Sequence, residues 1–130
     1  MILGIEYRIN PNVSSRVLNE LFASAWDGHV TKDFMAQLER SLFYIGAFSD
    51  SSLVGFVKVI SDASVHAFLL DTTVHKEFQH QGIGRELVTR AILESRARGC
   101  DWLHVDFEDH LENFYQSCGF KPTLAGLVKL

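Results

Sequence analysis

An extended apolar segment that passes through a glycine-containing turn into an amphipathic helix limits the fold of this chain more than any other feature. Residues 65–74 are apolar and β-branched enough to form a buried strand. After the turn, one face of a predicted helix is apolar, and it carries Ile83, Leu87, Val88, Ala91 and Ile92. The first amides of such a helix lack internal partners and lie at the positive end of its dipole. The turn is therefore a candidate anion site.

Two widespread phosphate-binding patterns fail at this turn. The P-loop needs Lys followed by Ser or Thr after its last glycine, and no such pair follows a glycine here. The dinucleotide pattern needs a third glycine three residues after Gly84, where Leu87 stands. Residues 79–84 instead read Q-x-x-G-x-G, which resembles the pyrophosphate-binding motif of the GCN5-related N-acetyltransferase (GNAT) family. The plainer alternative is a tight turn that uses Gly82 and Gly84 only to bend.

A second motif supports the same resemblance. Residues 112–120, ENFYQSCGF, are similar to the downstream signature of that family, in which three residues separate Phe-Tyr from Gly-Phe. The spacing predicts a short helix with Tyr115 on its apolar side, Gly119 just after its last turn, and Phe120 at the start of a strand. The two motifs occur in the family's order, with one predicted strand between them.

The rest of the sequence predicts alternating strands and helices. In chain order, we first expect a strand over 6–9, a helix with Asn12 as its N-cap and a second helix capped by Thr31. A hairpin of strands 43–48 and 53–61 follows around a turn at 49–52, and then the strand at 65–74 and a helix from 83 to about 98. The chain should end with a strand over 102–107, the Tyr115 helix and a last strand from Phe120.

This order implies, by the resemblance, a mixed α/β fold in a single domain at 1–130. The 130 residues, 47% of them hydrophobic, are enough for one proper core. The GNAT fold is a twisted mixed sheet flanked by helices. Two of its central strands, here 65–74 and 102–107, splay apart so that the pantetheine arm of acetyl-CoA can bind in the gap as an added strand would.

Composition excludes several classes of protein. A net charge of −4 without a basic stripe argues against nucleic acid, and no apolar run is long enough to cross a bilayer. The first residues, MILGIE, lack the basic start and cleavage pattern of a signal peptide. Cys100 and Cys118 lack metal-binding spacing and are expected to be reduced thiols in the cytoplasm. The scattered histidines predict no metal site.

The resemblance assigns acetyl-CoA to a run of positions around the turn. It places the pantetheine arm along the end of the strand, at Thr72, Thr73 and Val74. It places the pyrophosphate on the turn and first helical residues, Gln79, His80, Gln81, Gly82, Ile83, Gly84 and Arg85. The amide of Val74 matches the family's usual partner of the thioester carbonyl.

The catalytic residues follow from the same resemblance. Tyr115 matches the tyrosine that resembles a general acid in relatives, and its phenol would protonate the departing sulfur. The glutamate that serves as a base in some relatives corresponds to Phe68 here, so we expect Asp71 to take the proton, with His66 and water as alternatives. Glu108 stands where members often carry an asparagine that contacts pantetheine.

Two functions fit these motifs. The first is an enzyme that transfers acetyl from acetyl-CoA to an amine of a small molecule or peptide by direct attack. The second is a non-catalytic module that binds acyl-CoA. The first two helices, around 26–34, and the last strand would form the acceptor pocket. The carboxylates Asp71, Asp106, Glu108 and Asp109 favour a cationic acceptor, and a homodimer is compatible with the sequence.

Overall fold

The computed structural model describes residues 4–130 and contains one five-stranded sheet. Its strands are β1 (Ile5–Ile9), β2 (Phe43–Ser49), β3 (Ser52–Ser61), β4 (His66–Val74) and β5 (Trp102–His104). They lie in sequence order across the sheet. The first four are antiparallel neighbours, whereas β5 runs parallel to β4. Met1 to Leu3, which begin the segment used above to argue against a signal peptide, lie outside the described residues.

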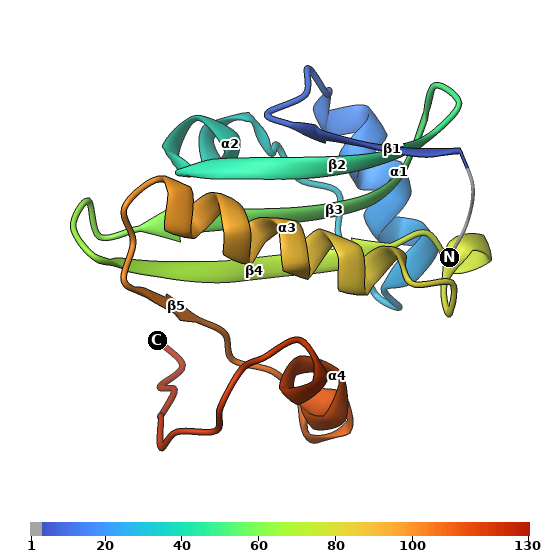
Figure 1. Cartoon of the computed structure of the whole chain (residues 1–130). Helices are drawn as coiled ribbons and strands as arrows, with labels where there is room; N and C mark the ends of the chain where they lie inside the picture. Colours follow the sequence, from blue (N-terminus) through green and yellow to red (C-terminus); the bar gives the residue numbers. More distant parts are fainter. Residues whose placement is uncertain (1–3) are drawn as a thin grey trace.

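Helices cover both faces of this sheet (Figure 1). The helices α1 (Ser15–Ala25) and α2 (Met35–Arg40) lie on one face, α3 (Ile83–Ala97) crosses the other, and the short α4 (Glu112–Ser117) lies beyond β5. A parallel pair such as β4 and β5 needs a crossover of this kind, and α3 provides it. The fold is therefore the mixed α/β arrangement with flanking helices that the motifs predict.

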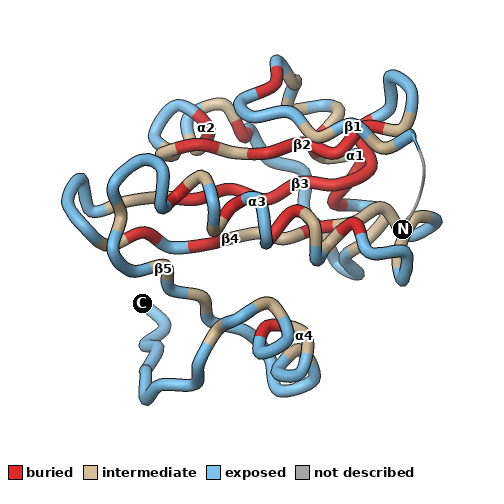
Figure 2. Tube along the Cα trace, in the orientation of Figure 1, coloured by how far each residue is buried: buried red, intermediate tan, exposed pale blue. Residues whose placement is uncertain are grey.

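Each face of the sheet has its own apolar core. On the α1–α2 face, the buried residues are Leu18, Leu21, Phe22, Phe34, Leu38, Phe48, Leu53 and Phe56. On the α3 face, Ile83, Leu87, Val88 and Ala91 pack on the middle strands, which therefore read as nearly continuous apolar runs. Figure 2 shows the burial concentrated along the central strands and the facing helix sides.

The hairpin between β2 and β3 forms at the predicted turn. Ser49 pairs with Ser52, so that Asp50 and Ser51 make a two-residue connection. Asp50 has a φ of 54°, a left-handed conformation that such tight hairpin turns require and that Asp tolerates better than most residues.

Both helix caps on the α1–α2 face differ from the prediction. Ser14, not Asn12, caps α1, because its side chain accepts a hydrogen bond from the Val17 amide. Thr31 does not cap α2; the Asp33 carboxylate accepts the Met35 amide at 2.9 Å instead. In each case the capping side chain is closer in sequence to the first helical residue than predicted. Only from such a position can its oxygen reach the free amides of the first turn. No helix within residues 4–130 is both long and apolar enough to cross a membrane.

The end of the chain also departs from the prediction. The strand expected over 102–107 ends at His104, and the strand expected from Phe120 does not form. Residues 121–130 are all exposed (Figure 2). Pro122 cannot donate a ladder hydrogen bond, and the short β5 offers little edge to pair with.

The core on the α3 face gives the first testable expectation. Leu87 is fully buried on α3, whereas Leu93, on the same helix, keeps 56% of its surface exposed. Leu87→Ala should lower the free energy of unfolding by about 2–5 kcal/mol, because it removes buried methyl groups and leaves a cavity. Leu93→Ala should change it by less than about 0.5 kcal/mol. Urea denaturation of both variants measures the difference, and equal losses would contradict this assignment of the core.

Candidate functional site

The sheet opens between β4 and β5. Only His66, Ala67 and Phe68 pair with β5, opposite residues 102–104. Beyond Phe68, β4 continues to Val74, and no described strand pairs with its outer edge there. The chain after β5 turns away toward α4 (Figure 1). The predicted splaying of the two strands is confirmed, and it leaves a row of β4 backbone groups available to a ligand.

Tyr115 closes one side of this opening. Its side chain is only 6% exposed, and its hydroxyl lies 3.4 Å from the Thr72 hydroxyl oxygen across the gap. Its ring stacks on Phe107, with 4.9 Å between ring centroids, and meets the rings of Phe114 and Phe120 edge-on. Burial, reinforced by the nearby Asp106, raises the pKa of the phenol above its ordinary value, although the Thr72 hydrogen bond acts against the rise. The phenol is therefore protonated at neutral pH.

The turn between β4 and α3 has an unusual backbone conformation and leaves the start of α3 without a side-chain cap. Gln79 donates its side-chain amide to the Val74 carbonyl at 3.0 Å, which ties the turn to the end of the strand. His80 and Gly82 both have positive φ, 63° and 90°. Gly82 is the N-cap of α3, and no side chain caps that helix. Its first amides are thus left to an external acceptor.

The two glycines of the motif play different parts. A Cβ added at Gly82 would meet no atom within 4 Å, so it would point into the open space before the helix. A Cβ at Gly84 would lie 3.6 Å from Phe114 and from Val74, which is ordinary van der Waals contact. Gly84 therefore packs against α4 and β4 but leaves room for a Cβ, whereas Gly82 has the left-handed conformation that favours glycine and faces open space.

Arg85 has a protein partner. Its guanidinium donates to the Ser117 hydroxyl at 2.7 Å and to the Ser117 carbonyl at 2.8 Å. These bonds join the first turn of α3 to the end of α4, the helix that carries Tyr115. The sequence predicts that Arg85 contacts the pyrophosphate; here the same side chain holds the two motifs together.

Asp71 lies at an irregularity in β4. The β3–β4 register runs from Phe56–Thr73 to Lys58–Leu70, so two residues of β4 stand opposite one residue of β3. This is a β-bulge, and Asp71 adopts a φ of 60° within it. Its carboxylate forms an ion pair with Lys58 at 3.0 Å.

The alternative proton acceptor, His66, lies near the start of β4. Its Nδ1 is 2.8 Å from Nε2 of His104, so the two imidazoles share a hydrogen bond. Phe68, which the sequence predicts in place of the relatives' glutamate, stacks on His104 with ring centroids 4.6 Å apart. These three residues belong to the closed end of the β4–β5 pairing.

The acidic residues predicted to attract a cation lie at the end of β5 and the start of α4. Asp106, Glu108 and Asp109 are all exposed. Asp106 is close enough to Tyr115 to influence its pKa, whereas Glu108 lies 3.6 Å from the His110 imidazole. Within residues 4–130, no three His, Cys, Asp or Glu side chains group as metal ligands would.

Sequence reasoning missed the residues that support the site from behind. Lys58 is 8% exposed on β3 and bonds to Asp71 and to the side chain of Gln37. Trp26 donates its indole N–H to the Thr73 hydroxyl at 3.0 Å. The sequence could have predicted a role for Lys58, because a single lysine inside the apolar run LVGFVKVI needs a polar partner if that strand is buried. No comparable signal marks Trp26 or Ser117.

Comparison with known proteins agrees with this geometry. Residues 15–120 match the family model described as "Acetyltransferase (GNAT) family". The uncharacterized N-acetyltransferase ycf52 of Gracilaria tenuistipitata var. liui is 26% identical over 124 residues, which are 92% of this chain and 68% of that protein. GCN5-related N-acetyltransferase 2, chloroplastic, of Arabidopsis thaliana is 27% identical over 78 residues, 60% of this chain and 30% of that one.

Solved structures share the fold. A GNAT family acetyltransferase of Streptococcus pneumoniae superimposes with a TM-score of 0.82 at 22% identity, covering 97% of both chains. The aminoglycoside N-acetyltransferase AAC(6')-Iy, solved in complex with CoA, superimposes with a TM-score of 0.77 at 19% identity, covering 97% of this chain and 93% of the other. The two motifs lie on either side of the unpaired edge of β4, and the family model matches most of the chain. This chain therefore belongs to the GNAT family of acetyltransferases.

Proposed function

We propose that this protein transfers the acetyl group of acetyl-CoA to an amine, and that residues 1–130 form one acetyltransferase domain. One observation carries the proposal: the unpaired edge of β4, the uncapped start of α3 and the Tyr115 hydroxyl lie together at the end of β4. The pantetheine arm of acetyl-CoA needs a free strand edge, its phosphates need free amides, and the leaving sulfur needs a hydrogen-bond donor. Solved neighbours that hold CoA support the choice of cofactor.

In this proposal, acetyl-CoA binds mainly to the backbone. The pantetheine arm lies along Thr72, Thr73 and Val74 and forms hydrogen bonds with the free β4 edge. The pyrophosphate faces the amides that follow Gly82, at the positive end of the α3 dipole. Such a cradle needs no basic side chain, which fits a protein with a net charge of −4.

The reaction is a direct attack. The amine nitrogen forms a bond to the thioester carbonyl carbon, the Val74 amide stabilises the oxyanion, and the C–S bond then breaks as the sulfur gains a proton. Tyr115 supplies that proton or a hydrogen bond to the sulfur. An ordinary phenol has a pKa about 1.5 units above a thiol, so full transfer is uphill by about 2 kcal/mol. Because burial raises the pKa of Tyr115 further, we propose that its main role is to donate a hydrogen bond as charge develops on the sulfur. The CoA thiolate then takes its proton from water.

The amine must also lose a proton. Asp71 is the predicted acceptor, but its carboxylate is engaged by Lys58, and taking up a proton would break that ion pair. We therefore propose that water relays the proton, with Asp71 favouring its departure through charge. His66 is the alternative acceptor of the amine proton, because a neutral imidazole in the His66–His104 pair has a ring nitrogen that can bind a proton.

We propose a cationic amine as the acceptor. Asp106, Glu108 and Asp109 are exposed where the chain leaves β5, and they would draw a positive charge toward the opening. Among the structural neighbours, AAC(6')-Iy is named as an aminoglycoside N-acetyltransferase, and it was also solved with the bisubstrate analogue CoA-S-monomethyl-acetylneamine.

We also place the protein in the cytoplasm, where half-buried Cys100 and Cys118 would stay as free thiols.

Acetyl-CoA binding tests the turn. We expect micromolar affinity, and at one hundred times Kd the ligand should stabilise the protein by about 2.7 kcal/mol. Gly82→Ala should weaken binding at least tenfold, because its methyl group would stand before the free amides. Gly99→Ala is the matched control: Gly99 lies at the other end of α3 with the same φ of 90° and the same empty surroundings. Calorimetry that gives equal affinities for the two variants would contradict the site.

Removal of one hydroxyl tests the chemistry. Tyr115→Phe should lower kcat by between about 10- and 10⁴-fold, with little change in acetyl-CoA affinity, because only the hydrogen bond to sulfur is lost. Tyr7→Phe, on β1 at the far edge of the sheet, should leave kcat unchanged. Thiol release is the assay. If the wild type binds acetyl-CoA but releases no thiol with any amine, the protein is instead a non-catalytic acyl-CoA-binding module.

The acceptor proposal predicts a response to salt and pH. For a cationic amine, kcat/KM should fall as salt rises, since charges about 10 Å apart are largely screened at 0.1 M. It should rise with pH toward a plateau above neutrality, as more amine becomes neutral. Because the raised pKa of Tyr115 keeps its proton in place, the plateau should persist until pH approaches that pKa. A neutral best substrate with a flat salt response would refute the assignment to the acidic residues.

A further inference from the structure

Lys58 is the buried charge that the reaction described above does not use. It points from β3 toward the α1–α2 side, where its ammonium group bonds to Asp71 and to the side-chain oxygen of Gln37 on α2. Its side chain is 10% exposed, and that of Asp71 is 34% exposed. A lysine withdrawn from water in this way destabilises the fold unless its partners are well placed. The pair is therefore built around a specific geometry.

That geometry centres on the left-handed conformation of Asp71. An L-residue at this φ costs roughly 1–2 kcal/mol relative to the right-handed regions, because its Cβ crowds the following carbonyl. Such conformations persist where the surroundings determine them. The Lys58 ammonium holds the Asp71 carboxylate, and so it holds the side chain on the face that this backbone conformation requires.

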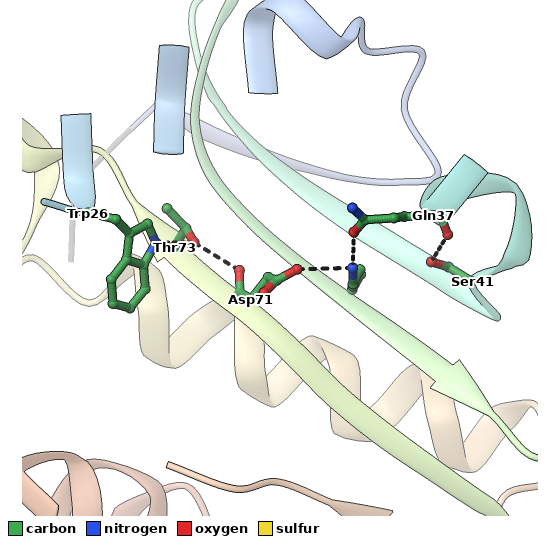
Figure 3. Close-up of polar contacts among 6 residues, drawn as sticks. Trp26, Gln37, Ser41, Asp71 and Thr73 are labelled. Atoms are coloured by element: carbon green, nitrogen blue, oxygen red, sulfur yellow. Dashed lines mark hydrogen bonds and ion pairs between the residues drawn. The ribbon is translucent and has the colours of Figure 1, made fainter. Parts of the chain in front are cut away.

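A second contact fixes the backbone of the same residue. The Thr73 hydroxyl donates to the Asp71 carbonyl at 2.9 Å and accepts the indole N–H of Trp26, which follows α1, at 3.0 Å. Figure 3 shows this chain of contacts running from Trp26 through Thr73 and Asp71 toward Gln37 and Ser41. The bulge is thus tied to both helices of the α1–α2 face.

The bulge, formed by Asp71 and Thr72, lies at the start of the strand segment proposed to hold pantetheine. It lets Leu70 and Thr73 keep their pairs on β3 although β4 has an extra residue between them. Thr72 therefore faces Tyr115, whereas Thr73 faces Trp26. Without the extra residue, both side chains would move to the opposite faces, because a one-residue shift turns every following side chain over.

We propose that Lys58 is a positioning residue: acting through Asp71, it fixes the bulge in β4 and so presents the backbone of residues 72–74 to acetyl-CoA. This inference rests on the proposed function. It assigns Lys58 no contact with the cofactor. It also gives Asp71 a role that depends on its conformation rather than on uptake of a proton.

Two double variants separate conformation from charge. Lys58→Met with Asp71→Ala and Lys58→Met with Asp71→Gly both remove the whole ion pair, so neither leaves an unpaired buried charge. They differ only in the Cβ at position 71. Glycine adopts positive φ readily, whereas alanine does not. The affinity of the folded full chain for acetyl-CoA, measured by calorimetry, is the readout.

We expect the alanine double variant to bind acetyl-CoA roughly five- to thirty-fold more weakly than the wild type, which is the cost of the left-handed conformation expressed as a dissociation constant. The glycine double variant should recover to within about threefold of the wild type. Asp50→Ala is the matched control, since Asp50 is also left-handed, with a φ of 54°, but lies in the β2–β3 turn. It should lower stability and leave the affinity unchanged.

Three results would overturn the inference: wild-type affinity in the alanine double variant, equal weakening in both double variants, or equal weakening by Asp50→Ala. The first would mean that the ion pair does not set the bulge. The second would mean that the conformation of residue 71 is not what the cofactor needs. The third would reduce the effect to general destabilisation. A wild type that does not bind acetyl-CoA at all would instead overturn the proposed function, and this inference with it.

Discussion

The parallel pairing of β4 with β5 stops after three residue pairs, and the rest of the site depends on that early stop. A sheet normally satisfies its backbone groups by pairing. Here the last residues of β4 keep a free edge inside the molecule, because the chain leaves β5 after His104 and forms α4. Tyr115 can reach Thr72 only because no strand lies between them. The opening is therefore a product of topology, and the side chains around it adjust its chemistry.

Two kinds of contact keep this opening in shape. On one side, Arg85 joins the first turn of α3 to Ser117 at the end of α4, so the turn before α3 and the helix that carries Tyr115 are held together. Behind it, Lys58 and Trp26 secure the bulge from the opposite face of the sheet. The Arg85 contacts are exposed, whereas the Lys58 ion pair is largely buried and the Trp26–Thr73 bond is partly buried. Loss of the buried contacts should distort the strand, whereas loss of the exposed contacts should loosen the two motifs relative to each other.

The sequence predicts the parts of this protein that follow local rules. The strand before the turn, the length of α3 and the αL glycine after α4 all agree with the structure, because periodicity and glycine placement determine them. The strand predicted from Phe120 was wrong: it followed from the spacing of the second motif, and the short β5 offers little edge for it to pair with. The contacts of Lys58, Trp26 and Ser117 join residues distant in sequence, so no local pattern contains them. The predicted cofactor residues around the turn remain a proposal that binding experiments must test.

The uncapped start of α3, with Gly82 before it, has a consequence for how such sequences diverge. A ligand held by main-chain amides constrains the path of the backbone and leaves exposed positions such as His80 and Gln81 open to exchange. Selection on this turn therefore acts on dihedral angles more than on functional groups. A lineage that replaced most of its side chains could therefore keep such a turn intact. Residues that contact other groups of a substrate can then change independently of a site made of backbone.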